Sequence, residues 1–235
     1  SPTPHAEILE AAKDLLKEKG YTLEIKEFDD YPQQNVVVDE GEFDANYFQH
    51  QPYLDNFNEE KGSDLVSAAK IHYEPLGIYP GASEDLENIK DGAKIAVPND
   101  ATNEARALLL LEENGIITLK DDAGLNATKK DVEENPHNIE IVELDAAQIA
   151  RVVDELDFVV LNGNYALDAG FNVQTDAIAK EEADSEAAQT YANIIAVKKE
   201  NKDSEKIKAL VEVLQSEEIS KFITDTYEGA VVPMK

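Results

Sequence analysis

Three aromatic side chains and a proline lie at spacings that could form a ligand pocket. Phe48 and His50 are two residues apart, so an extended segment directs both to one side. Pro52 opens a helix, and Tyr53 follows on its first turn. This group could wall an apolar slot with a polar lip. A cluster of aromatic core residues beside a helix start would give the same pattern, and the local sequence does not separate the two.

Arg106 could bind an anionic group. It stands about one turn into an apolar helix expected near residues 105–111, after the polar run that begins at Asn99. Free N–H groups and the positive dipole end at such a helix start favour an anion, and a guanidinium binds a carboxylate through two hydrogen bonds. The local alternative is an ion pair with Glu104 or a neighbouring carboxylate.

Asn162 and Asn193 each stand at the end or the start of an apolar run with strand character. A polar side chain there is costly unless it is paired. An amide carries both a donor and an acceptor, so it could satisfy the ammonium and the carboxylate of a zwitterion together. Asn162 could equally be a turn residue before Gly163. A turn is less natural at Asn193, because the strand pattern runs on through it.

Catalytic motifs give no positive signal. The sequence has no nucleophile elbow, no zinc-protease helix and no glycine-rich phosphate loop, and none of His5, His50, His72 and His137 stands four residues from another. We therefore expect no catalytic residue, no metal and no cofactor. An enzyme that uses His50 as a general base is one alternative. A purely adhesive surface protein is another.

Composition restricts the partners. The chain of 235 residues has 21 basic and 50 acidic side chains, a formal charge of −29, and no cysteine. This charge repels nucleic acid and anionic lipid surfaces, and the absence of cysteine excludes disulfides and thiolate chemistry. No apolar run approaches the roughly 20 residues that span a bilayer, and no signal peptide is visible. We expect a protein whose leader has been removed.

Apolar periodicity predicts alternating helices and strands. The first 75 residues read as a helix that ends at Gly20, a strand over 21–28, a helix over 32–41, a helix from 52 and a strand over 65–71. That alternation is typical of a mostly parallel α/β layer. Further strands are expected at 93–97, 139–144, 158–161 and 191–198, and further helices at 83–92, 105–111, 146–156, 204–214 and 217–227. The acidic segment 174–188 reads as a loop with a short helix.

Two crossovers, near residues 78 and 190, predict two α/β lobes. Residues 1–78 begin the first lobe, 79–191 form the second, and 192–235 return to the first. A cleft between two such lobes is a favoured place for a small ligand.

Taken together, the sequence resembles the NlpA lipoprotein family, the methionine-binding lipoproteins of ABC importers. The likeness covers nearly the whole chain, and its most specific part is the run Phe48-Gln49-His50-Gln51-Pro52-Tyr53-Leu54. The other matching runs, in order, are residues 2–9, 44–47, 72–79, 97–100 with 102–103, 162–166 and 229–232. One departure is at 32–34, where Tyr31 is followed by Pro-Gln-Gln instead of the more usual aliphatic pair and proline before Asn35.

The resemblance implies an α/β, two-lobed periplasmic-binding-protein (type II-like) fold with the ligand in the interlobe cleft. It also implies L-methionine or a close relative as the ligand, with a methionine-containing dipeptide or another amino acid left open. By position, the side-chain pocket would comprise Tyr31, Phe48, His50 and Tyr53, and the α-amino and α-carboxylate groups would be held by Asn103, Arg106, Asn162 and Asn193. Arg106 would take the carboxylate, and aromatic rings suit a polarisable thioether.

The resemblance further implies a monomer that delivers its ligand to a membrane permease. It implies an extracytoplasmic location, through a lipid anchor on a cysteine upstream of these residues. An additional first strand of the fold is expected upstream as well.

Overall fold

The structure is a computed structural model that describes residues 1–182 and 186–234, and these form two compact units. Unit 1 comprises Ser1–Glu74 and Ala183–Lys235, and unit 2 comprises Pro75–Glu182. These limits differ from the predicted ones. Strand β3 (Gly77–Pro80) pairs with β8 (Phe158–Leu161) and with β9 (Ala179–Lys180), so unit 2 already begins before β3 and ends shortly after β9.

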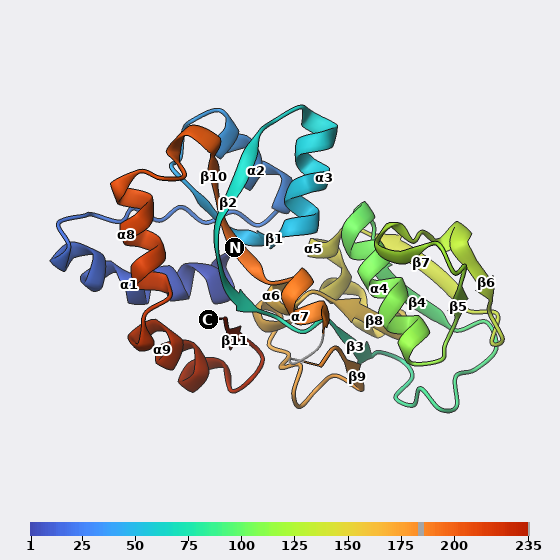
Figure 1. The fold of residues 1–235 in the computed structure, drawn as a ribbon. Helices are drawn as coiled ribbons and strands as arrows, with labels where there is room; N and C mark the ends of the chain where they lie inside the picture. Colours follow the sequence, from blue (N-terminus) through green and yellow to red (C-terminus); the bar gives the residue numbers. More distant parts are fainter. Residues whose placement is uncertain (183–185, 235) are drawn as a thin grey trace. The chain divides into compact units, whose positions relative to one another are not determined.

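The sheet of unit 1 has the order β1-β10-β2-β11 (Figure 1). Its strands are β1 (Asn46–His50), β2 (Leu65–Tyr73), β10 (Asn193–Lys198) and β11 (Val232–Pro233). All three strand pairs are antiparallel, so the expectation of a mostly parallel layer is wrong for this sheet. β1 and β2 are not neighbours because β10, from the returning segment, lies between them.

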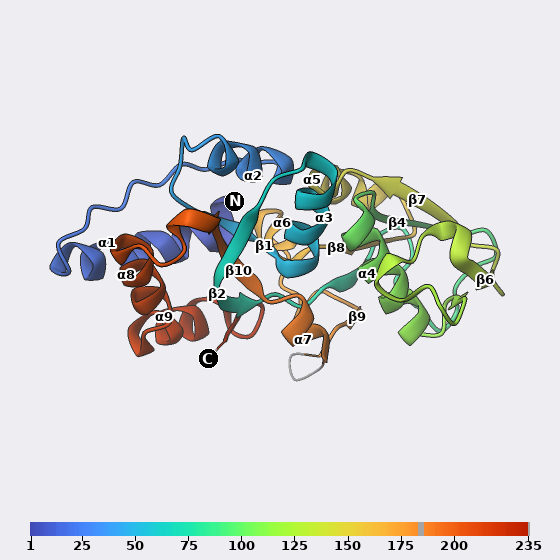
Figure 2. The ribbon, with the colours of Figure 1, turned by 45° about the horizontal axis from the view of Figure 1, so that its top comes forward.

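Helices cover both faces of the unit 1 sheet. On one face lie α2 (Tyr31–Asp39) and α3 (Gln51–Lys61), whose Val38, Leu54 and Phe57 pack on Ile194 and Ala196 of β10. Figures 1 and 2 both show α1 (Glu7–Glu18), α8 (Glu205–Leu214) and α9 (Glu217–Tyr227) grouped together on the other side. The alternation of β10 thus buries its side chains on both faces.

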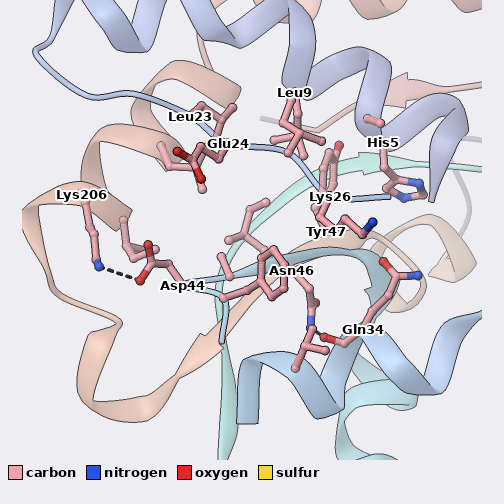
Figure 3. Close-up of a pocket in the computed structure, with 18 of the residues that line it drawn as sticks. His5, Leu9, Leu23, Glu24, Lys26, Gln34, Asp44, Asn46, Tyr47 and Lys206 are labelled. Carbon is pink, nitrogen blue, oxygen red and sulfur yellow. Dashed lines mark hydrogen bonds and ion pairs between the residues drawn. The ribbon is translucent and has the colours of Figure 1, made fainter. Parts of the chain in front are cut away.

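Residues 21–28 are not the predicted strand. They have no strand partner in the described part of the chain, although their polar–apolar alternation is typical of one. A cavity of about 390 Å³ is lined by this segment, by residues 42–47 at the start of β1, and by Leu9 and Leu210 from helices α1 and α8 (Figure 3). The segment is not a strand, because a strand requires a paired neighbour, which the alternation of a sequence cannot reveal.

The sheet of unit 2 has the order β7-β4-β8-β3-β9. β4 (Lys94–Pro98) is parallel to β7 (Glu140–Leu144) and β8, whereas β3 is antiparallel to β8 and β9. Helix α4 (Ala101–Glu113) buries Leu108 and Leu111 against Ile95 and Val160. The remaining elements are α5 (Ala146–Ile149), α6 (Gly163–Asp168) and the small hairpin of β5 (Thr118–Leu119) and β6 (Val132–Glu134), while α7 (Glu186–Thr190) lies in unit 1.

Two predicted helices of unit 2 differ in the structure. Residues 83–92 form bends and turns, because the Ser83 hydroxyl donates to Asp157 Oδ1 at 2.8 Å instead of capping a helix. The helix expected over 146–156 is α5 followed by a 3-10 segment, Ala150–Glu155, with a non-helical kink at Val152. Among the described residues, no helix combines the length and apolar character needed to cross a bilayer.

Gly81 provides a stability test of the turn that follows β3. A Cβ at this position would lie 2.3 Å from the carbonyl oxygen of Leu156 and 2.4 Å from that of Val153. We expect Gly81→Ala to lower the free energy of unfolding by about 1–3 kcal/mol or more, because backbone atoms must move to admit the methyl group. Denaturant unfolding measures this change. The exposed neighbour Ala82→Gly is the control, and equal stability of both variants would contradict the expected clash.

Candidate functional site

The first group of candidate residues forms an aromatic cluster in unit 1. The rings of Tyr31 and Phe48 lie 5.5 Å apart, Tyr31 and Tyr53 5.7 Å, and Phe48 and Tyr53 5.8 Å. His50 ends β1 and caps α3, where its Nδ1 accepts the backbone N–H of Tyr53 at 3.2 Å. The His50 ring also lies 5.1 Å from the ring of Tyr191. Tyr31, Phe48, His50 and Tyr53, which the sequence placed in one pocket, are therefore brought together.

A buried amide network fixes the backbone under this cluster. Asn35 Nδ2 donates to Gln49 Oε1 at 2.8 Å, and Asn46 Nδ2 donates to Asn35 Oδ1 at 2.8 Å. Tyr47 pairs with Ile195 and Gln49 with Ile194, so Phe48 forms a bulge between them. Because Asn35 ties α2 to β1, the unusual residues at 32–34 leave the ring of Tyr31 beside Phe48.

In unit 2, two candidate residues and a supporting aspartate form a chain of hydrogen bonds: Asp100, Asn103 and Asn162. Asp100 caps α4 and accepts hydrogen bonds from Asn103 Nδ2 at 2.9 and 3.0 Å. Asn162 Nδ2 donates to Asn103 Oδ1 at 2.9 Å. The side-chain oxygen of Asn162, Oδ1, is buried and has no hydrogen-bond partner among the described residues. Burial raises the pKa of Asp100, against the hydrogen bonds from Asn103 and Thr102 that lower it. This series holds the oxygen of Asn162 ready to accept a hydrogen bond.

Arg106 pairs with a carboxylate far away in the sequence. Its Nε donates to Glu181 Oε1 at 2.8 Å and its Nη2 to Glu181 Oε2 at 2.6 Å, and both side chains are buried. Glu181 Oε2 also accepts the backbone N–H of Leu76 at 2.9 Å. Glu104, the local alternative partner, instead accepts the backbone N–H of Lys129 at 3.0 Å. The pair fixes the plane of the guanidinium.

Asn193 opens β10 directly opposite His50 of β1, so it belongs to the same unit as the aromatic cluster. Its Oδ1 lies 2.8 Å from His5 Nε2. Its Nδ2 has no hydrogen-bond partner in the part of the chain that the structure describes. Unit 1 therefore holds five of the eight candidate residues, and unit 2 holds Asn103, Arg106 and Asn162.

Four supporting residues are not indicated by any local sequence pattern: His5, His72, Glu74 and Glu181. The nearest ligand atoms of His5, His72 and Glu74 all lie within 4.8 Å of one another, an arrangement that could hold a metal ion. In the structure His72 Nε2 is hydrogen-bonded to Glu74 Oε1 at 2.6 Å, and His5 Nε2 lies 3.3 Å from the same oxygen while it is hydrogen-bonded to Asn193. His5 lies in residues 2–9, and His72 and Glu74 lie in residues 72–79, which are two of the runs that match the family. No local sequence pattern indicates that the two runs meet.

The cavity of Figure 3 is a separate feature of unit 1, and His5 is one of its lining residues. None of the eight candidate residues lines it, and Figure 3 shows the Lys206–Asp44 ion pair on one side and His5 on the other. Its lining residues are mostly apolar side chains, with a few charged ones such as Glu24, Lys26 and Glu42.

The chain has two α/β units. One carries an aromatic cluster, and the other carries an arginine and two hydrogen-bonded amides. These features are those of a two-lobed substrate-binding protein. The chain belongs to the NlpA lipoprotein family, whose model matches residues 1–235. It is similar to a solved lipoprotein from Ruminococcus gnavus, with 66% identity, a TM-score of 0.99, and coverage of 100% of this chain and 97% of that one.

Two further relatives carry functional names. The methionine-binding lipoprotein MetQ of Bacillus subtilis is 44% identical over 99% of this chain and 85% of its own length. A nutrient-binding protein from Burkholderia cenocepacia, solved bound to methionine, is 43% identical with a TM-score of 0.93, over 99% of this chain and 95% of that one. Both likenesses extend over nearly the whole chain, so both units are shared.

Proposed function

We propose that this protein is the substrate-binding protein of an ABC importer and that it binds L-methionine. The observation that carries the proposal is the packing of Tyr31, Phe48 and Tyr53 within 6 Å of one another, in a chain 43% identical to a protein solved with methionine. Aromatic rings contact a thioether sulfur favourably, at about 0.3–1.5 kcal/mol per contact.

The zwitterionic end of the ligand is assigned to the polar residues. Arg106 takes the α-carboxylate, and Asn103, Asn162 and Asn193 complete the hydrogen bonds of the α-carboxylate and α-amino groups. The buried oxygen of Asn162 supports an ammonium partner, because a buried acceptor without a donor is costly until a ligand supplies one.

The protein delivers its ligand to a membrane permease and carries out no reaction of its own. Family membership supports a lipid anchor upstream of these residues and an extracytoplasmic location. The proposal also includes that the protein is a monomer and uses no cofactor. His50 does not serve as a general base in this proposal, since its Nδ1 caps α3. Incubation with a bound amino acid should yield no product by mass spectrometry.

Calorimetric titration with a panel of ligands tests the proposal. We expect L-methionine to bind at submicromolar Kd, about −8 kcal/mol or better, and leucine to bind more weakly because it lacks the sulfur. The protein should first be unfolded and refolded, which removes ligand retained through purification. D-methionine and glycyl-methionine complete the panel. Tight binding of either would reassign the ligand within the same role, and no binding by any member would contradict an amino-acid site.

A further inference from the structure

His5 is a buried histidine that contacts Asn193, one of the candidate residues. Its side chain is 1% exposed, and its Nε2 lies 2.8 Å from Asn193 Oδ1 and 3.3 Å from Glu74 Oε1. Its other ring nitrogen, Nδ1, lies 2.6 Å from the Ser1 hydroxyl. Every polar atom of the ring therefore has a partner, and the identity of those partners determines where its proton lies.

Glu74 fixes the tautomers of both neighbouring histidines. Its Oε1 accepts a hydrogen bond from His72 Nε2 at 2.6 Å, so that atom carries hydrogen. The same oxygen lies 3.3 Å from His5 Nε2, where its negative charge favours an N–H over a lone pair, so His5 Nε2 also carries hydrogen and donates it to Asn193. The two Nδ1 atoms then accept, from the hydroxyls of Ser1 and Tyr47. Burial, followed by the charge of Glu74, raises the pKa of Tyr47, so the phenol keeps the proton that it donates. Burial lowers the pKa of His5 well below its usual value, so the ring is neutral with one N–H.

The N–H of His5 in turn fixes the amide of Asn193. Because His5 Nε2 donates, the atom of Asn193 that faces it is the oxygen. The amide nitrogen lies on the other branch of the side chain, with its two hydrogens unused by any described residue. Asn162 has the opposite arrangement, since its nitrogen is used by Asn103 and its oxygen is left.

We propose that His5, held by Glu74, is a positioning residue that makes Asn193 a hydrogen-bond donor, so that Asn193 binds the carboxylate of the ligand and selects for ligands that carry one. This inference rests on the proposed function. It extends that function to a residue that does not touch the ligand, and it assigns opposite roles to two asparagines. Asn193 donates to the carboxylate, and Asn162 accepts from the ammonium.

Isosteric aspartate substitutions test the two roles. Asn193→Asp keeps the oxygen that faces His5 and replaces the NH2 group with a second oxygen, so the affinity for L-methionine should fall by roughly a hundredfold or more, as expected for a lost donor and a repelled carboxylate. Asn162→Asp loses the hydrogen bond to Asn103 but keeps the acceptor for the ammonium, so its loss of affinity should be at least about tenfold smaller. Calorimetry measures both, with thermal unfolding to confirm folding. Equal losses, or tighter binding by Asn193→Asp, would overturn the assignment.

Variants at His5 separate positioning from a purely structural role. Gln can place an N–H near the position of Nε2 and Leu cannot, so His5→Leu should weaken L-methionine binding by about tenfold and His5→Gln should restore most of it. Equal affinity in both variants would contradict the proposal. Nitrogen-15 NMR of the refolded, ligand-free protein should show the Nε2–H tautomer of His5 at neutral pH, and the Nδ1–H tautomer would overturn it without reference to any ligand. Failure of the proposed function would appear differently, as absence of binding by the unaltered protein.

Discussion

Replacing Arg106 with methionine should weaken L-methionine binding by roughly a hundredfold, since truncating one member of a buried charge pair costs about 2–5 kcal/mol. It should also lower the free energy of unfolding by about 3–5 kcal/mol, because Glu181 would remain buried without its counter-ion. Methionine fills most of the volume of arginine, so the effect measures the lost charge more than a cavity. Calorimetry and denaturant unfolding give the two quantities on one sample.

A second substitution separates binding from stability. In the double variant Arg106→Met with Glu181→Gln, the remaining amide can still accept the N–H of Leu76 while the unpaired charge is removed. The free energy of unfolding should recover most of its loss, and the affinity should stay low because no cation is left for the carboxylate. Recovery of both quantities would show that Arg106 acts only through the fold. Unchanged affinity in the single variant would remove Arg106 from the site.

The parts of the fold that depend on local signals were predictable from the sequence. The apolar run of β8 is a local signal, and so is the apolar run of α4, which follows Asp100. Both elements lie where the sequence predicts them. Pairing between distant strands is not a local signal. For this reason the sequence does not predict that β10 lies between β1 and β2. It also predicts a strand over residues 21–28, which have no strand partner among the described residues.

The candidate site divides in the same way. Phe48, His50 and Tyr53 are close in sequence, and their grouping around the start of α3 followed from spacing alone. Glu181 stands 75 residues from Arg106, and His5 stands 188 residues from Asn193, so neither partner could be chosen among 50 acidic side chains and four histidines. What sequence could not supply is the orientation of each amide and guanidinium, which these distant partners determine.

Shortening Phe48 to alanine should lower the free energy of unfolding by about 3–5 kcal/mol, because its side chain is buried and its removal leaves a cavity beside Tyr31 and Tyr53. Phe48→Leu is the more informative change, since it keeps an apolar side chain and removes the ring. We expect it to reduce the preference for methionine over norleucine by about two- to tenfold, the value of one lost sulfur–aromatic contact. Competition calorimetry with the two ligands measures that ratio.

Phe57→Leu is the matched control for this effect. Phe57 is buried in the same unit, against Leu54 and Ile194, and it belongs to the core between α3 and the sheet. Its substitution should lower stability to a similar extent and leave the methionine-to-norleucine ratio unchanged. If Phe48→Leu also left the ratio unchanged, the aromatic cluster would be a packing feature and the sulfur would be recognised elsewhere. A change confined to Phe48 would assign the thioether to these rings, since stability alone cannot alter a ratio between two ligands of the same shape.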